Sequence, residues 1–212
     1  MVEIAEKSPR AARVREQRIP IILKAAETEF ARHGFGGATI QGIADQANLP
    51  KPNVLYYFGN KEELYEAVLN NIVKLWNSEL DNICPEDGPA SSLERYIRSK
   101  VEVSRKYPEA CRIFASEIVH GAGRLPDSVS AETRYWVNEK VRVFSAWIES
   151  GRMAPVDPMH LLFMIWGTTQ HYADYESQIS SIINKRTLPK SFYDEAADTI
   201  CEIVLRGCGL RT

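Results

Sequence analysis

The feature that most limits the fold of this chain is the spacing of its apolar residues. Over almost all of the 212 residues they recur every three or four positions, which places them on one face of a helix, and no strand-like alternation persists. The pattern therefore predicts an all-α fold of about nine helices. From helix start and stop signals, we expect them near residues 18–33, 40–47, 50–57, 60–80, 91–106, 108–120, 128–150, 159–183 and 191–206.

The distribution of charge separates a basic head from an acidic body. Residues 1–62 contain 9 Lys and Arg against 7 Asp and Glu, and the remaining residues contain 17 against 21. This asymmetry within a net charge of −2 fits a head that binds DNA. We predict a flexible basic arm at 1–17, a helix-turn-helix DNA-binding domain at 18–64 and a larger ligand-binding and dimerisation domain at 65–212. The arginines Arg10, Arg13, Arg15 and Arg18 are either solvated or touch phosphate or a minor groove.

Several other functions have no support in the sequence. The four cysteines form no C-x-x-C pair and no histidine lies at zinc-ligand spacing from them, so we expect reduced structural thiols, no metal and no cofactor. No Ser-His-Asp arrangement, phosphate-binding loop or pair of buried carboxylates stands out, so no residue is predicted to be catalytic. No apolar run reaches the roughly 20 residues of a membrane span, and the N-terminus lacks a signal peptide. We therefore expect a cytoplasmic protein without a membrane partner.

Residues 39–58, TIQGIADQANLPKPNVLYYF, carry the most information about function. Two short helices joined by a tight turn must bury one shared face, and the small residues Ala44 and Ala47 allow them to cross closely. Thr39 is expected to cap the first helix and Asn48 to adopt the left-handed turn conformation. The residues of the second helix that point outward are Lys51, Pro52, Asn53, Tyr56 and Tyr57, as a recognition helix requires.

This segment resembles the TetR family of transcriptional regulators. The family pattern appears as Thr39, Ile40, Ile43, Ala44, Ala47, Asn48, Leu49, Pro50, Val54, Tyr57, Phe58 and Lys61, preceded by Phe30, Gly34 and Gly37. Asn48 replaces the usual Gly, Pro50 the usual Ser and Leu55 the common Tyr, and Pro52 stands where a small residue is frequent. These departures affect the operator that is read rather than the fold.

The resemblance implies roles for individual residues. It implies that Thr39 contacts a phosphate, that Lys51, Asn53 and Tyr56 contact bases, and that Tyr57 and Lys61 clamp phosphate. Gln41 and Pro52 complete the predicted DNA-binding set. The alternative is that the two tyrosines pack in the core and that the two lysines are solvated surface residues.

Four stretches further resemble the RutR-like subgroup, which regulates pyrimidine degradation. They are residues 54–58, 61–76, 100–114 and above all 156–175, VDPMHLLFMIWGTTQHYADY. The resemblance implies that uracil or thymine is the effector and that it weakens operator binding. The rival within the family is a repressor that senses an unrelated hydrophobic compound.

The residues themselves are compatible with a nucleobase site. Phe163, Trp166, Gln170 and Asp174 recur at helical spacing, so one helix face offers aromatic planes followed by an amide and a carboxylate. Trp76 is predicted to close the other side. The alternative is that the aromatic residues belong to the core and that the polar ones are surface residues. His171 and Tyr172 fit the lining of a pocket and a dimer interface equally well.

The last two helices are expected to form a homodimer, because in the family they pack as a four-helix bundle. The residues Leu161, Leu162, Ile165, Ile200, Ile203 and Val204 offer apolar surface for it. A two-fold dimer demands a palindromic operator. A helical adaptor without a DNA role is the remaining alternative, which the pattern at 39–61 disfavours.

Overall fold

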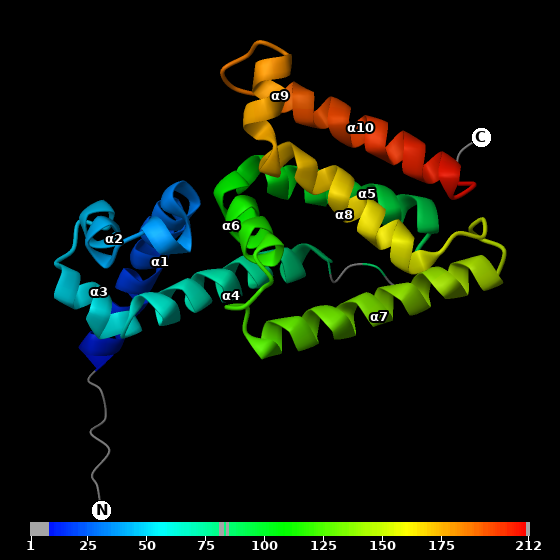
Figure 1. Ribbon diagram of the computed structural model, residues 1–212. Helices are drawn as coiled ribbons and strands as arrows, with labels where there is room; N and C mark the ends of the chain where they lie inside the picture. The colour runs from blue at the N-terminus through cyan, green and yellow to red at the C-terminus, as the bar shows by residue number, and fades with distance from the viewer. Residues whose placement is uncertain (1–8, 81–82, 84, 211–212) are drawn as a thin grey trace, which may run out of the picture.

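The computed structural model describes residues 9–80, 83 and 85–210, and over these ranges the chain is entirely helical, as predicted. Ten helices follow one another (Figure 1): α1 (Pro9–Gly37), α2 (Ile40–Gln46), α3 (Lys51–Phe58), α4 (Lys61–Leu80), α5 (Pro89–Lys106), α6 (Pro108–Val119), α7 (Asp127–Glu149), α8 (Pro158–Asp174), α9 (Glu176–Ile182) and α10 (Lys190–Gly207). The count exceeds the predicted nine because the helix expected at 159–183 breaks at Tyr175, whose φ and ψ of −114° and 24° leave the helical region.

The first helix begins earlier than the sequence pattern indicates. Since α1 starts at Pro9, residues 9–17 of the predicted flexible arm are helical, whereas residues 1–8 lie outside the described residues, as do the side chains of Arg10, Arg13 and Arg15. Pro20 was expected in the first turn, but it lies inside α1, where it removes one helical hydrogen bond. At the other end Gly34, with φ of 64° and ψ of 176°, interrupts the helix near the predicted end at residue 33, and α1 continues to Gly37.

The N-terminal helices pack as a unit at one end of the molecule, and α4 runs from them toward the body (Figure 1). Their shared core is apolar and includes residues of α6: its buried members are Ile22, Ala25, Ala26, Phe30, Ala38, Ile43, Ala44, Ala47, Val54, Leu64, Tyr65, Val68, Leu69, Ile72, Ala110 and Ile113. Because α6 contributes to this core, the N-terminal head is packed directly against the body.

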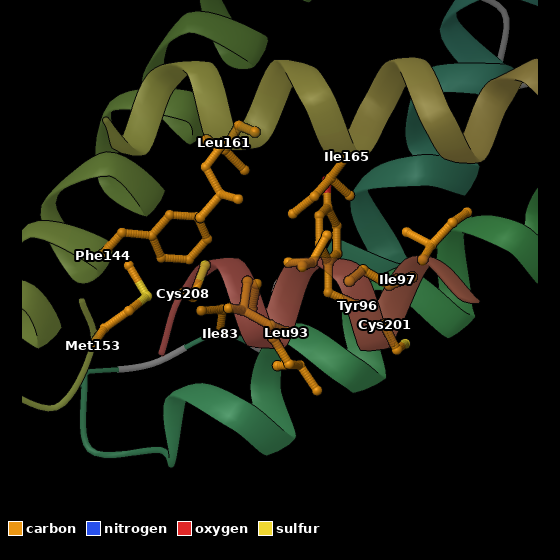
Figure 2. Close-up of a cluster of buried hydrophobic side chains, with 14 of the residues drawn as sticks. Ile83, Leu93, Tyr96, Ile97, Phe144, Met153, Leu161, Ile165, Cys201 and Cys208 are labelled. Atoms are coloured by element: carbon orange, nitrogen blue, oxygen red, sulfur yellow. The ribbon is translucent and has the colours of Figure 1, made fainter. Parts of the chain in front are cut away.

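The body is built around a second core, in which α5, α7, α8 and α10 meet (Figure 2). Leu93 and Ile97 of α5, Phe144 of α7 and Ile165 of α8 are fully buried in it. Asp157 caps α8 by accepting a hydrogen bond from the backbone N–H of His160 at 2.9 Å, and Pro158 follows in the first turn. Over the described residues no helix is long and apolar enough to cross a membrane.

Most of the residues predicted to form the dimer interface lie inside the subunit. The buried ones are Leu161, Leu162, Ile165, Ile200 and Val204, and all five belong to the core of the body. Ile203 differs, with 63% of its surface exposed. The prediction was wrong for Leu162, Ile165 and Ile200, because α8 and α10 pack on α5 through these apolar stripes. Leu161 and Val204 belong to the same core but also line a groove between α8 and α10.

Candidate functional site

The turn between α2 and α3 has the geometry of a helix-turn-helix. The hydroxyl of Thr39 accepts a hydrogen bond from the Gly42 N–H at 2.9 Å and caps α2. Asn48 has φ of 52°, and the Leu49 N–H returns to the Ala44 carbonyl at 2.9 Å. Val54 of α3 is fully buried against α2. The two helices are therefore held at a fixed angle, with the outer face of α3 left open.

The outer face of α3 carries the predicted base-reading residues. Lys51, Pro52 and Asn53 are exposed, and Tyr56 exposes 73% of its surface. Tyr57 is only half-buried and packs edge-on against Tyr56, with ring centroids 5.3 Å apart. The first four side chains are thus available to a groove, and Tyr57 supports the ring of Tyr56.

Gln41 lies on the exposed face of α2, one turn from the helix cap. Its amide nitrogen donates to the Asp45 carboxylate at 2.8 Å, a pair that keeps the side chain extended along the helix. Thr39 is also exposed, so both residues lie on the surface of the head.

The structure gives Lys61 an internal role that the sequence pattern did not predict. Its ammonium group donates to the carbonyl oxygens of Phe35 at 2.9 Å and Ala38 at 3.2 Å, and it lies 4.5 Å from the centroid of the Phe35 ring. Two of its three N–H donors therefore hold the turn that leads into α2. One donor remains for a phosphate.

Glu29 is a further buried group that positions the head. Its carboxylate accepts hydrogen bonds from the Thr39 N–H at 3.3 Å and from the Gln46 amide at 2.7 Å. A Cβ at Gly42 would collide with this carboxylate, so the close approach of α1 and α2 requires glycine there. The sequence signal was a Glu on the apolar stripe of α1, between Ala26 and Phe30.

Polar contacts join the head to α6 of the body. The Tyr65 hydroxyl donates to the buried Glu117 carboxylate at 3.1 Å, and the same carboxylate accepts from the Arg124 N–H at 2.8 Å. The Arg124 guanidinium lies 3.9 Å from the centroid of the Phe35 ring. Burial and the Glu117 charge raise the pKa of Tyr65, so the hydroxyl remains a donor. We call Tyr65, Glu117, Arg124 and Phe35 the joint.

A small cavity of about 90 Å³ lies in the body where five helices meet. Its walls are Val73 and Trp76 of α4, Lys100 of α5, Phe114 of α6, Thr133 and Trp136 of α7, and Trp166 and Gln170 of α8. Trp76 and Phe114 meet edge-to-face with centroids 4.4 Å apart, and Trp136 and Trp166 stack at 6.2 Å. The cavity therefore combines large aromatic surfaces with a few polar groups.

Two polar groups at this cavity have no partner within the described part of the chain. The indole N–H groups of Trp76 and Trp136 are buried without a hydrogen bond, which costs about 1–3 kcal/mol each. By contrast, the Trp166 N–H donates to the Tyr96 hydroxyl at 2.6 Å. Both residues line the cavity, and their indole N–H groups remain unsatisfied among the described residues.

Of the five predicted ligand-binding residues, Trp76, Trp166 and Gln170 line the cavity, but Phe163 and Asp174 do not. Phe163 is 49% exposed and is not part of the cavity wall, although its ring lies beside that of Trp166 with centroids 5.8 Å apart. Asp174 lies one turn beyond Gln170 and hydrogen-bonds to it, and burial raises its pKa from 3.8 to about 6. One oxygen of this carboxylate is buried without a partner among the described residues.

Sequence reasoning missed Lys100, Phe114, Thr133 and Trp136, which come from three other helices. A usable signal existed for Lys100, because it interrupts the apolar stripe of α5 that contains Tyr96 and Ile97. Within the described residues there is no cluster of three or more His, Cys, Asp or Glu that could hold a metal. Cys111, Cys201 and Cys208 are buried and form no disulfide within the described part of the chain, and Cys84 lies outside it.

Comparison with known proteins finds a matching family for both the N-terminal and the C-terminal part of the chain. Residues 22–68 match the family model described as bacterial regulatory proteins, tetR family, and residues 69–211 match the one described as YcdC-like protein, C-terminal region. The chain belongs to the TetR family of transcriptional regulators.

Among curated relatives of this TetR-family regulator, the HTH-type transcriptional regulator RutR of Escherichia coli is 38% identical over 88% of each chain. The HTH-type transcriptional repressor NicS of Pseudomonas putida is 28% identical over 88% of this chain and 90% of its own. The chain is therefore a RutR-like member of the family. Since these relatives are named as transcriptional regulators, it is a regulator and not an enzyme.

Solved structures agree on the fold. The ketosteroid transcriptional regulator KstR2 of Mycobacterium tuberculosis superposes with a TM-score of 0.73 at 19% identity, over 90% of this chain and 94% of its own. A putative fatty acid metabolism regulator of Clostridium perfringens gives 0.72 at 22% identity, over 88% and 97%. At this identity the likeness concerns the fold of the regulator alone.

Proposed function

We propose that this regulator binds a palindromic operator as a homodimer and releases it when uracil or thymine occupies the cavity of the body. The observation that carries the effector assignment is the cavity itself. Its volume of about 90 Å³ suits a single six-membered ring, and its walls are indole planes with unpaired N–H groups. Gln170 adds an amide that both donates and accepts.

A hydrophobic effector, the rival assignment, fits this cavity poorly. A drug or acyl chain needs several hundred cubic ångströms, far more than the cavity offers. It would also leave the Trp76 and Trp136 N–H groups without acceptors, whereas the two carbonyl oxygens of a pyrimidine-dione satisfy them. The resemblance to the pyrimidine-degradation subgroup favours the same choice.

The proposed dimer interface is the outer face of α8 and α10. Met164 and Ile203 are exposed there and line a groove between the two helices, together with His160 and Gly207. A Cβ at Gly167 or Gly207 would meet no neighbour, so a second helix can approach closely. The occupant that we propose is a second copy of this chain, which completes a four-helix bundle and presents two α3 helices to one operator.

The proposed signal passes from the cavity to the head through α4 and α6. Trp76 and Phe114 line the cavity and touch each other, and one lies on α4 and the other on α6. The same two helices carry Tyr65 and Glu117 of the joint. A ligand that separates the two rings therefore shifts the helices that fix the distance between the two heads of the dimer.

Thermal unfolding tests the effector assignment. Uracil or thymine at about 100 times its dissociation constant should stabilise the protein by roughly 2.7 kcal/mol, whereas cytosine, adenine and hydrophobic compounds should not. Gln170→Ala should lose the shift and Gln178→Ala, on the exposed face of α9, should keep it. The absence of a shift with either pyrimidine would overturn this effector and leave the regulator assignment intact.

A further inference from the structure

The walls of the cavity carry hydrogen-bond donors that have no acceptor in the described chain, and one of the lining residues, Lys100, is cationic when protonated. The indole N–H groups of Trp76 and Trp136 are buried without a partner in the described chain, and Lys100 adds an ammonium group to the same walls. A neutral uracil ring has two carbonyl acceptors and two N–H donors of its own. A ring that has lost the proton between its carbonyls offers three adjacent acceptors: oxygen, nitrogen and oxygen.

Lys100 is the only side chain lining this cavity that carries a charge. It is buried on the inner face of α5, and its Nζ lies 5.0 Å from the centroid of the Trp76 ring. The titratable groups that act on it are Cys111 of α6 and Asp174 of α8, while α4 and α7 contribute the neutral residues Trp76, Thr133 and Trp136.

The charge of this lysine is poorly compensated in the protein alone. Burial lowers the pKa of Lys100, and Asp174 opposes this effect only in part. The pKa of Cys111 is raised by burial to about 11, so its thiol is neutral at ordinary pH and supplies no anion. A ligand with negative charge would therefore stabilise the ammonium form of Lys100.

On the basis of the proposed function, we infer that Lys100 makes this cavity specific for a pyrimidine-dione that binds as its imide anion. On binding, the N–H bond between the two carbonyls breaks heterolytically. The electron pair stays on the ring, spread over nitrogen and both oxygens, and the proton passes to the Lys100 amine where burial has left it neutral, or to the solvent where Lys100 is already an ammonium. Lys100 is thus a specificity-determining residue that selects the effector by the acidity of its N–H group.

Ligand pairs of matched size test this inference on the wild-type protein. Fluorine is close to hydrogen in size and bromine to methyl, so 5-fluorouracil is compared with uracil and 5-bromouracil with thymine. In each pair the halogen makes the N–H more acidic. The more acidic ligand should bind more tightly, by up to about tenfold for each unit by which its pKa falls, as long as that pKa stays above the pH of the titration.

Calorimetric titration of the same dimer in buffers of different ionisation enthalpy measures the proton directly. Uracil should release up to one proton per site to the buffer, in proportion to the fraction of Lys100 that is an ammonium before binding. Lys100→Met should fold, because it replaces a buried charge with an apolar side chain of similar length. It should lose both the proton release and the preference for halogenated rings. Lys106→Met, at the exposed end of the same helix, should keep both.

The outcomes separate this inference from the proposed function. Equal affinities within each pair overturn the role of Lys100 and leave pyrimidine sensing intact. Retention of the halogen preference in Lys100→Met also overturns it. Failure of all four pyrimidines to bind wild-type protein overturns both.

Discussion

The head and the body of this regulator differ in how their functional residues are distributed along the chain. The surface of the head that we propose to bind DNA comes from one short stretch of chain, and Lys51, Asn53 and Tyr56 on it are exposed. The cavity of the body takes its walls from five helices between Val73 and Gln170, and its polar groups are buried. A surface that must meet a partner can be encoded locally, whereas an enclosed site depends on how distant helices pack.

The largest expected effect comes from the exposed face of α3. Asn53→Ala or Tyr56→Ala should weaken operator binding at least tenfold, because a lost base contact costs about 1–3 kcal/mol and is lost in both half-sites. The melting temperature should stay unchanged, since neither side chain supports the core. Fluorescence anisotropy at fixed salt measures the affinity. Tyr135→Ala on α7, where the tyrosine is 70% exposed, is the matched control and should bind operator normally.

The next effect tests whether the joint links the two regions. Tyr65→Phe removes the hydrogen bond to Glu117 and should cost about 1 kcal/mol of stability. Uracil should bind as before, but more of it should be needed to release the operator. Tyr96→Phe removes a hydroxyl that accepts from Trp166 and should instead weaken uracil binding. Equal release curves for wild type and Tyr65→Phe would show that the signal bypasses the joint.

An effect of similar size is expected on the pH dependence of the free energy of unfolding. The pKa of Asp174 is raised to about 6, so the folded state holds this proton more tightly than the unfolded state does. The resulting stability is complete below the unfolded value near 3.8 and is lost as the pH rises through about 6. Relative to Asp174→Asn, the wild type should lose on the order of 1 kcal/mol between about pH 5 and pH 7, after allowance for partial solvent screening.

Urea unfolding at several pH values measures this difference. Asp194→Asn, which changes an exposed carboxylate on α10, serves as the control and should follow the wild type. A profile of Asp174→Asn parallel to the wild type would show that Asp174 is not buried enough to hold its proton.

The smallest expected effect is that of Phe163→Ala on the effector. Because Phe163 lies outside the cavity, uracil affinity should change by less than about twofold, in contrast to the cost of roughly 1–3 kcal/mol for a lost hydrogen-bonding residue. Calorimetry measures it. A large loss of affinity would place this ring at the ligand after all and enlarge the site along α8.

The fold and the helix-turn-helix could be predicted because both follow from short-range rules. Thr39 as a cap, Asn48 in the left-handed region and the buried Val54 each depend on neighbours within a few residues. The start of α1 could not be predicted in the same way, because Pro20 resembles a first-turn proline and yet lies inside the helix.

The cavity was predictable only in part. Helical spacing placed Trp166 and Gln170 on the correct face of α8, but it placed Phe163 there as well. Helical periodicity predicts which face of a helix a side chain lies on, but not how far along that face other helices pack. Phe163 therefore lies on the same face of α8 as Trp166 and yet remains half exposed. The lysines on apolar stripes were the overlooked signal: Lys100 lines the cavity, and the buried Lys140 donates to the Ile83 carbonyl at 3.3 Å.

The walls around the cavity also affect the rates at which the effector binds and leaves. A ring held between Trp76, Trp136 and Trp166 is bounded by five helices, so its entry and exit are coupled to their relative motions, which occur in microseconds to milliseconds. Association should therefore be slower than diffusion allows, and the bound effector should persist after its concentration falls. The regulator would then average the supply of its effector over the lifetime of the complex rather than follow each brief fluctuation.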